Sequence, residues 1–262
     1  MNEINQTLFI PLFGKAQVSR KNMILQDKKA EEIWEKEAFP ITGKAKSKWL
    51  TYFMAMRARV FDDWTDSMLA QKQDTLVLHI GCGLDSRCFR VKESYKKWID
   101  ADFSDVIQLR RCYFEETEHY HMAVVDASKT DDILKLPDAS DVIVILEGIS
   151  MYLTNEELKA LLSVLQEKYA SVHLLMDTYT EFAAKASKYK NPVHEVGVTK
   201  LYGITGMEQL IMGTKLNIKA EHSFTPDLLI RELKGFDRIF FQTVFAGKMT
   251  GRIYRLYELE TA

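Results

Sequence analysis

Residues 75–90 read TLVLHIGCGLDSRCFR, and this stretch decides the fold. Its first half is the short, mostly apolar run that is typical of a buried strand. Gly81 and Gly83 follow at once, and glycine has no Cβ and tolerates positive φ, so a ligand can approach the backbone closely. The stretch therefore predicts a strand, a glycine turn and a helix that face a ligand, although an ordinary tight turn would also place glycines here.

Short strand-like runs alternate with helical stretches from Asp74 onward, which is typical of a mostly parallel sheet flanked by helices. Right-handed crossovers then give a doubly wound, Rossmann-like α/β sheet whose ligand crevice lies at the carboxyl ends of the strands. The runs 239–246 and 253–259 flank a glycine-containing turn and predict an antiparallel hairpin that ends the sheet. The parallel strands are predicted at residues 75–80, 97–101, 122–125, 141–146 and 172–176.

The rest of the chain divides around this sheet. Residues 1–70 carry apolar side chains at three- and four-residue intervals and predict an N-terminal helical cap. Residues 71–262 then form the Rossmann-like domain, with a variable insertion around 179–214. Thr154 and Glu157 have the spacing of a capping box at the start of a helix. A further helix is predicted between Thr225 and Gly235, from its cap residue, its early proline and its terminal glycine.

Charge and composition exclude several classes of function. The chain has 35 basic and 37 acidic residues, a formal net charge of -2 and no long run of either sign, so we expect no nucleic-acid partner. No apolar run approaches the roughly 18 residues of a membrane span, and the N-terminus lacks the basic region of a signal peptide. The three cysteines show no metal-ligand spacing. We expect a cytoplasmic protein with free thiols and no metal; the sequence is silent on oligomeric state.

Three acidic residues follow predicted strands, where the crevice is expected. Asp102 comes about 20 residues after the glycines, where a carboxylate can accept hydrogen bonds from ribose hydroxyls; a solvated turn or a helix cap is the alternative. Asp126 could accept the exocyclic amine of adenine or serve in a turn. Glu147 ends the most apolar strand, a costly position for a carboxylate unless it faces the crevice or is paired.

The residue at the third position of the glycine motif narrows the class of ligand. A dinucleotide-binding fold would place a third glycine where Ser86 stands, because that position packs the helix closely against the strand. A ligand without a pyrophosphate has less need of the close helix N-terminus that binds the phosphates of a dinucleotide. The pattern therefore favours an adenosine that bears an amino acid over a nicotinamide dinucleotide.

Five blocks follow one another in order along the chain: LFGKA (12–16, continuing to Asp27), RARVFDD (57–63), GCGLDSRCFR (81–90), DADFSDVI (100–107) and LEGISMYL (146–153). Together they resemble the leucine carboxyl methyltransferase family, in its branch of tetracenomycin-type polyketide O-methyltransferases. Two departures stand out: Ser104 replaces the family's proline, and His79 stands where many class I methyltransferases outside the family have an acidic residue. Serine can cap the following helix, so the first is tolerated.

The resemblance implies a class I methyltransferase fold and S-adenosylmethionine as the cofactor. It places Arg57 on the methionine carboxylate of the cofactor and Glu147 near its amino group. Lys15 or Arg20 would supply a second cation for the carboxylate.

The same resemblance assigns the remaining positions of the site. Gly81 and Gly83 would admit the cofactor, and Asp102 would hold its ribose. Asp126 with Ala127 would meet the adenine, and Tyr152 would line the acceptor side as a tentative catalytic residue.

The function expected is an O-methyltransferase that acts on a carboxylate or hydroxyl of a small molecule. Methyl transfer from a sulfonium is an in-line displacement, so proximity and orientation supply most of the acceleration. A general base is needed only where the acceptor must lose a proton, and the sequence leaves open which kind of acceptor applies. A non-catalytic cofactor-binding scaffold or sensor is the alternative, and a nicotinamide oxidoreductase comes third.

Overall fold

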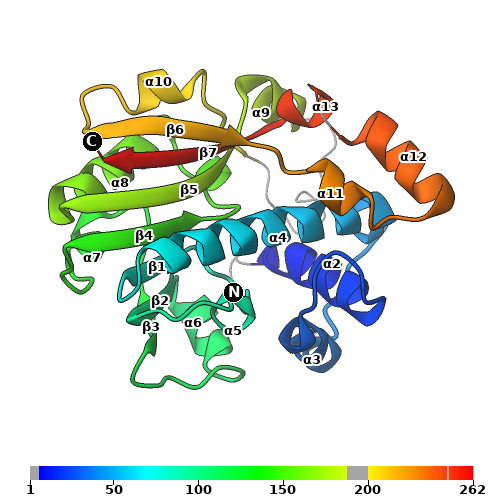
Figure 1. Ribbon diagram of the computed structural model, residues 1–262, viewed down its shortest axis with the longest axis horizontal. Coiled ribbons are helices and arrows are strands. Elements are labelled where there is room, and N and C mark those ends of the chain that lie inside the picture. Colours follow the sequence, from blue (N-terminus) through cyan, green and yellow to red (C-terminus); the bar gives the residue numbers. More distant parts are fainter. Residues whose placement is uncertain (1–5, 188–199, 247, 262) are drawn as a thin grey trace.

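The computed structural model describes residues 6–187, 200–246 and 248–261. They form one seven-stranded sheet in the order β3-β2-β1-β4-β5-β7-β6, with helices on both of its faces (Figure 1). The strands are β1 (Leu76–Ile80), β2 (Lys97–Asp102), β3 (Tyr120–Val124), β4 (Asp141–Leu146), β5 (Ser171–Tyr179), β6 (Leu216–His222) and β7 (Tyr254–Thr261).

Strands β1 to β5 are parallel, and each overlaps one of the five predicted strands, so the doubly wound parallel sheet is confirmed. The strand order reverses at β1, whose neighbours are β2 on one side and β4 on the other. A crevice opens at such a reversal, because the connections on its two sides lead to opposite faces of the sheet. The topology therefore places the ligand site at the carboxyl ends of β1 and β4.

The N-terminal part is helical as predicted. Helix α4 crosses one face of the sheet, α2 packs against α4, and α3 packs against α2 (Figure 1). The helices in chain order are α2 (Phe9–Arg20), α3 (Lys28–Glu37), the 3-10 turn η1 (Gly43–Lys46), α4 (Lys48–Gln71), α5 (Arg87–Arg90), α6 (Ser104–Arg110), α7 (Thr130–Leu134), the 3-10 turn η2 (Ser150–Tyr152), α8 (Asn155–Lys168), α9 (Glu181–Ser187), α10 (Met207–Leu210), α11 (Asp227–Ile230), α12 (Gly235–Val244) and α13 (Lys248–Gly251).

The sheet buries both of its faces, which is why its central strands are apolar throughout. Alternate residues point to opposite faces of a strand, so Val77 and Ile143 pack with α2 and α4. Leu78 and Val144 pack on the other face with Leu161 and the rest of α8. The N-terminal helices therefore complete the core on one face of the sheet.

The antiparallel end of the sheet is confirmed, but one of its two strands was misassigned. Residues 239–246, predicted as a strand, belong largely to helix α12. Phe241 and Phe245, four residues apart, stack on the same side with ring centroids 5.7 Å apart, which fits a helix period. The partner of β7 is instead β6, an edge strand that bulges between Ile218 and Ala220. Its alternating apolar and polar residues, LNIKAEH, are the signal that the prediction missed.

Of two helix ends predicted from the sequence, one is confirmed and one is wrong. The capping box at α8 is confirmed, since the Thr154 side chain accepts from the Glu157 N–H and the Glu157 carboxylate accepts from the Thr154 N–H. The helix predicted between Thr225 and Gly235 is shorter. Only α11 forms there, and Gly235 (φ +53°) begins α12 rather than ending a helix.

The variable insertion predicted around 179–214 is described only in part. Its described portions include α9 and α10, whereas residues 188–199 lie outside the described residues. None of the helices in the described ranges combines the length and the apolar character that a lipid bilayer requires of a spanning helix.

Candidate active site

A cavity of about 1000 Å³ opens at the carboxyl ends of β1, β2 and β4, between the sheet and the N-terminal helices. The structure brings all nine predicted site residues into its lining: Lys15, Arg57, Gly81, Gly83, Asp102, Asp126, Ala127, Glu147 and Tyr152. Arg20, offered as an alternative to Lys15, does not line the cavity. Its Nη2 donates to Glu35 at 2.6 Å on the surface, so of these two cations only Lys15 lies at the cavity.

The glycine turn after β1 shapes the wall of the cavity. Gly81 has φ +74° and Gly83 has φ +52°, in the region that favours glycine. A Cβ on Gly81 would lie 1.9 Å from Cγ2 of Ile149, so no larger residue fits without a shift of the chain. The turn can therefore adopt this conformation because Gly81 and Gly83 carry no side chain.

We expect Gly81→Ala to destabilise the protein by at least about 2 kcal/mol, because it adds a steric clash to an unfavourable φ. Urea unfolding at equilibrium measures the change. Gly213→Ala is the matched control, since Gly213 has φ +85° but no atom within 4 Å of its Cβ position. If the two variants lost the same free energy of unfolding, the steric clash would contribute nothing, and the unfavourable φ alone would explain the loss.

Asp102 ends β2 beside this turn. Its carboxylate accepts hydrogen bonds from the Gly83 N–H at 2.8 Å and from the Phe103 N–H at 2.7 Å. Burial raises the pKa of Asp102 although both hydrogen bonds oppose that shift. Each carboxylate oxygen has a further lone pair, so the group can still accept hydrogen bonds from a ligand in the cavity.

Asp126 fulfils the turn role that the sequence left open, and it lines the cavity as well. One of its oxygens accepts from the Ser128 N–H at 3.0 Å and from the Ser128 hydroxyl at 2.7 Å. Burial opposes ionisation, but these hydrogen bonds and Lys129 outweigh it and lower the pKa of Asp126. The carboxylate is therefore ionised and held in place at the cavity wall.

Nine charged side chains form a continuous buried network at one wall of the cavity. None has more than 8% of its side chain exposed. This buried ion network consists of Lys15, Asp27, Arg57, Asp62, Asp85, Arg87, Arg90, Glu147 and Asp177.

Arg87 is the centre of the network. Its Nε donates to Asp62 at 2.6 Å and its Nη2 to Glu147 at 2.5 Å. Arg90 lies one turn further along α5, and its guanidinium contacts Asp27 at 2.6 Å, Asp62 at 2.7 Å and Asp85 at 3.0 Å. The network thus ties α4 and the N-terminus of α3 to the loop that follows β1.

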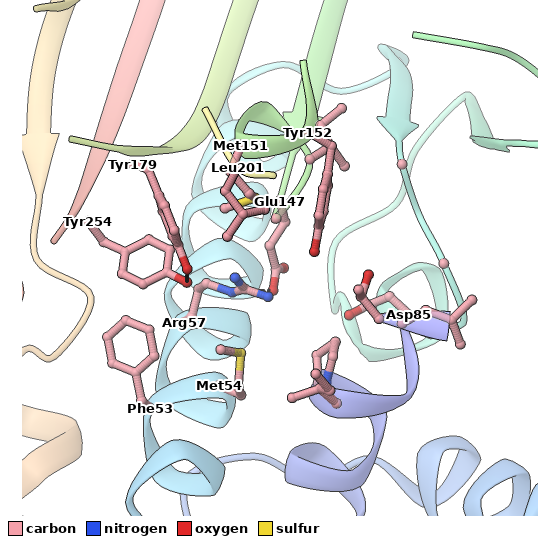
Figure 2. Close-up of a pocket in the computed structure, with 18 of the residues that line it drawn as sticks. Phe53, Met54, Arg57, Asp85, Glu147, Met151, Tyr152, Tyr179, Leu201 and Tyr254 are labelled. Atoms are coloured by element: carbon pink, nitrogen blue, oxygen red, sulfur yellow. Dashed lines mark hydrogen bonds and ion pairs between the residues drawn. The ribbon is translucent and has the colours of Figure 1, made fainter. Parts of the chain in front are cut away.

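Lys15 and Arg57, the two cations expected to bind a cofactor carboxylate, belong to this network. Lys15 pairs with Asp85. Arg57 donates from Nε to Glu147 at 2.9 Å and from Nη1 to Asp177 at 3.2 Å. In the described part of the chain, no hydrogen bond from its Nη2 is found. Figure 2 shows Arg57 and Glu147 side by side at the cavity, so the guanidinium can still donate to a ligand there.

Gly148 makes room for this guanidinium. It has φ +72°, and a Cβ there would lie 3.2 Å from Arg57 Nη2. The Glu-Gly pair at the end of β4 therefore serves two purposes: the glutamate anchors Arg57, and the glycine leaves space beside its free edge.

The two carboxylates that hold Arg57 titrate in opposite directions. Burial opposes ionisation of Glu147, but Arg87 and Arg57 outweigh it and bring the pKa of Glu147 to about 2. Asp177 is fully buried, and burial raises its pKa to about 6 although Arg57 and the Gly148 N–H oppose that shift. Glu147 is thus a permanent anion, whereas Asp177 changes charge near neutral pH.

Five members of the network were not predicted from the sequence: Asp62, Asp85, Arg87, Arg90 and Asp177. A signal for Asp177 is present, because this aspartate directly follows the apolar run 172–176, as Glu147 follows 141–146. The argument that an acid at the end of a buried strand is paired or functional applies equally to it. The other four lie in the blocks at 57–63 and 81–90, where the charges alone do not reveal which pairs with which.

The far side of the cavity is a mostly apolar and aromatic region that we call the acceptor chamber. Tyr179 and Tyr254 face each other across β5 and β7, and the Tyr254 hydroxyl donates to the Tyr179 hydroxyl at 2.7 Å. Both hydroxyls point toward Arg57 in Figure 2. The chamber is lined by Trp49, Leu50, Phe53, Met54, Met151, Tyr152, Tyr179, Phe182, Ala183, Leu201, Val244, Phe245, Ile253 and Tyr254.

Comparison with known families decides the identity. Residues 5–166, more than half of the chain, match the leucine carboxyl methyltransferase family. The chain belongs to this family. It is an S-adenosylmethionine-dependent methyltransferase, as the resemblance implied.

Two curated relatives agree with the family. The chain is 28% identical over 203 residues to the tetracenomycin polyketide synthesis O-methyltransferase TcmP of Streptomyces glaucescens, a match that covers 77% of this chain and 75% of that protein. It is 30% identical over 174 residues to the S-adenosyl-L-methionine-dependent methyltransferase dpfgK of Gibberella zeae, covering 60% of this chain and 58% of that protein.

Solved structures share the fold at low sequence identity. Magnesium protoporphyrin IX methyltransferase from Synechocystis with bound SAH is 12% identical with a TM-score of 0.53, covering 88% of this chain and 94% of that one. An S-adenosylmethionine-dependent methyltransferase from Mesorhizobium loti is 14% identical with a TM-score of 0.53, covering 76% and 97%. The family member described here therefore has the class I methyltransferase fold.

The polar groups that line the cavity are chemically compatible with the cofactor of this family. The Asp102 carboxylate could accept hydrogen bonds from ribose hydroxyls, and the Arg57 guanidinium has a free edge that could bind a carboxylate. Glu147, ionised beside it, suits an ammonium group. Among the described residues, no group of three or more histidine, cysteine, aspartate or glutamate side chains could hold a metal ion.

Proposed function

We propose that this methyltransferase transfers the methyl group of S-adenosylmethionine to an oxygen of an apolar, aromatic small molecule. One observation carries the proposal: a single cavity joins a polar wall of ionised side chains to the acceptor chamber. Its volume of about 1000 Å³ lies at the upper end of small-molecule sites. That room beside the polar wall favours an enzyme over a scaffold with a closed crevice.

We assign the polar wall to the cofactor. When bound, the cofactor supplies a methyl group that its sulfonium has already activated. Arg57 and Lys15, the latter paired with Asp85, would hold the carboxylate of its methionine part. Glu147, whose two oxygens accept from Arg57 and Arg87, would face the ammonium group. Asp102 would accept from the ribose hydroxyls, and Asp126 with Ala127 would meet the adenine. Gly81 and Gly83 would let the ligand reach the backbone of the turn.

The acceptor chamber favours an oxygen that is already ionised when it binds. Of the fourteen described residues that define the chamber, none is a carboxylate or an imidazole, so none of these is an ordinary general base. Its polar groups include the hydroxyls of Tyr152, Tyr179 and Tyr254. Burial raises the pKa of Tyr152 to about 12 and that of Tyr254 well above its usual range, so these two stay protonated. The Tyr254 proton is already donated to the Tyr179 hydroxyl, so Tyr152 is the hydrogen-bond donor that we assign to the acceptor.

An acceptor of this chemistry is an aromatic carboxylate or an acidic phenol. Tyr152 would orient its oxygen, because this residue lines both the chamber and the polar wall (Figure 2). The polyketide O-methyltransferase among the relatives supports the same class of acceptor. We further propose that residues 1–70 act as a cap and that the segment around 179–214 selects the acceptor, since both contribute lining residues.

We also propose that the protein acts in the cytoplasm. The thiols of Cys82, Cys88 and Cys112 are all free, which a reducing compartment maintains.

The test combines binding and turnover. We expect calorimetry to show binding of S-adenosylmethionine, and formation of its demethylated product with members of a panel of aromatic carboxylic acids and acidic phenols. Leu201→Trp, which fills the chamber, should reduce turnover at least about ten-fold by excluding the acceptor while leaving cofactor affinity within about two-fold. Absence of cofactor binding at high micromolar concentration, or turnover unaffected by Leu201→Trp, would contradict the proposal.

A further inference from the structure

The buried ion network carries one negative charge more than it carries positive charges when all its members are ionised. Its members are four cationic and five acidic side chains, joined by nine ion pairs. A surplus charge in a buried site is costly, because low polarisability screens it poorly. The network is therefore more stable when a cation binds beside it or when one carboxylate takes up a proton.

Asp177 is the member best placed to carry the surplus. It lies at one end of the network. Among the described residues its one ion pair is with Arg57 at 3.2 Å, and the same guanidinium also pairs with Glu147 at 2.9 Å. Its side chain is 0% exposed, so water does not solvate the charge. The Gly148 N–H donates to its other oxygen at 2.6 Å. Every other carboxylate in the network has a closer cation.

The groups that face Asp177 come from four neighbouring elements. Arg57 from α4 favours its ionised form, and Glu147 at the end of β4 disfavours it. The phenols of Tyr152 from η2 and Tyr254 from β7 lie within electrostatic range and stay neutral. With one cation shared between two carboxylates, the pKa of Asp177 is raised by burial to about 6, which agrees with the charge count.

We propose that Asp177 determines specificity for cofactor charge, and that it favours the positively charged methyl donor over the neutral demethylated product. The inference rests on the proposed cofactor site at the polar wall. S-adenosylmethionine carries one positive charge more than S-adenosylhomocysteine, and the two otherwise share every polar group. Asp177 does not itself line the described cavity, but it lies directly behind Arg57, which does, with Arg57 Nη1 3.2 Å from Asp177 Oδ2. Its negative charge would therefore act on the sulfonium through space. The neutral thioether of the product would gain no such attraction, so an ionised Asp177 would ease product release.

The test is the ratio of the two dissociation constants, product over donor, measured by calorimetry between about pH 5 and pH 7.5. Asp177 binds a proton below its pKa and then carries no surplus charge. In the wild type we therefore expect the ratio to rise with pH by at least about five-fold. Protons should be released on binding of the donor near about pH 6 and fewer on binding of the product; buffers with different ionisation enthalpies measure both.

Two variants separate Asp177 from the other buried carboxylate of the site. In Asp177→Asn the amide oxygen can still accept from the Gly148 N–H, and we expect the ratio to become independent of pH. Asp102→Asn removes a carboxylate whose pKa burial also raises, but it contacts the ribose that both ligands share. We expect this control to weaken both ligands equally and to keep the rise with pH.

The outcomes separate the inference from the proposed function. If neither ligand binds at any pH, the proposed cofactor site itself is wrong. If both bind but the wild-type ratio is flat, or rises as steeply in Asp177→Asn, then Asp177 has no role in specificity. If Asp177→Asn does not fold, the wild type alone provides the test. Equal proton release on binding of the donor and of the product would then contradict the inference.

Discussion

Replacing Arg87 by methionine is expected to destabilise the protein by about 3–5 kcal/mol, because it leaves buried carboxylates without their cation. The Arg87 side chain is 0% exposed and bonds Asp62 and Glu147 at once. Methionine retains much of the apolar volume but none of the charge. The free energy of unfolding in urea measures the effect, and inclusion-body expression would be the extreme form of the same result.

The matched control for Arg87→Met is Arg20→Met. Arg20 also pairs with a glutamate, Glu35 at 2.6 Å, but both side chains are at least 36% exposed. Exposed ion pairs contribute at most about 1 kcal/mol, so we expect little change. If the two variants lost similar free energy of unfolding, burial would not explain the contribution of the Arg87 ion pairs to stability.

The second large effect is expected on ligand affinity. Asp102→Asn should weaken binding of S-adenosylmethionine by about 1.5–3 kcal/mol, the cost of losing hydrogen bonds to a charged group. This corresponds to a rise in the dissociation constant of about 10- to 150-fold. The fold should survive, because the amide oxygen can replace one of the two contacts that Asp102 makes with the Gly83 and Phe103 N–H groups.

Asp126→Asn is the control for that measurement. Its carboxylate already accepts two hydrogen bonds from Ser128, and an amide oxygen can accept them equally well. We expect the dissociation constant to change by less than about five-fold. A larger effect at Asp126 than at Asp102 would mean that the ribose and adenine assignments need to be exchanged.

Local sequence patterns were enough for the parallel sheet and for most of the site. The five parallel strands are apolar because both faces of the sheet are covered, so each reads as a short apolar run. Gly81, Gly83, Asp102 and Glu147 follow such runs directly, which places them at the carboxyl ends of strands and hence at the crevice. The same rule would have found Asp177, had it been applied to the fifth strand.

The end of the chain was harder to predict, because residues 239–246 contain apolar side chains that suit a helix and a strand alike. What separates the two states is packing. Phe245 contacts Trp49 of α4 with ring centroids 5.8 Å apart, and a helix is what brings it there. The half-exposed edge strand β6 has few apolar residues and therefore a weak signal.

Local patterns in the sequence were sufficient to predict the class of fold, the glycine turn at the cavity and the acidic residues that face the crevice, because strand burial and glycine turns depend on neighbouring residues. The pairing of the charges became evident only in the folded protein. Arg57 and Asp177 are 120 positions apart, and no local pattern specifies such a partner. The same holds for the acceptor chamber, whose side chains come from the N-terminal helices, from η2 and from β7, and meet only when the chain has folded.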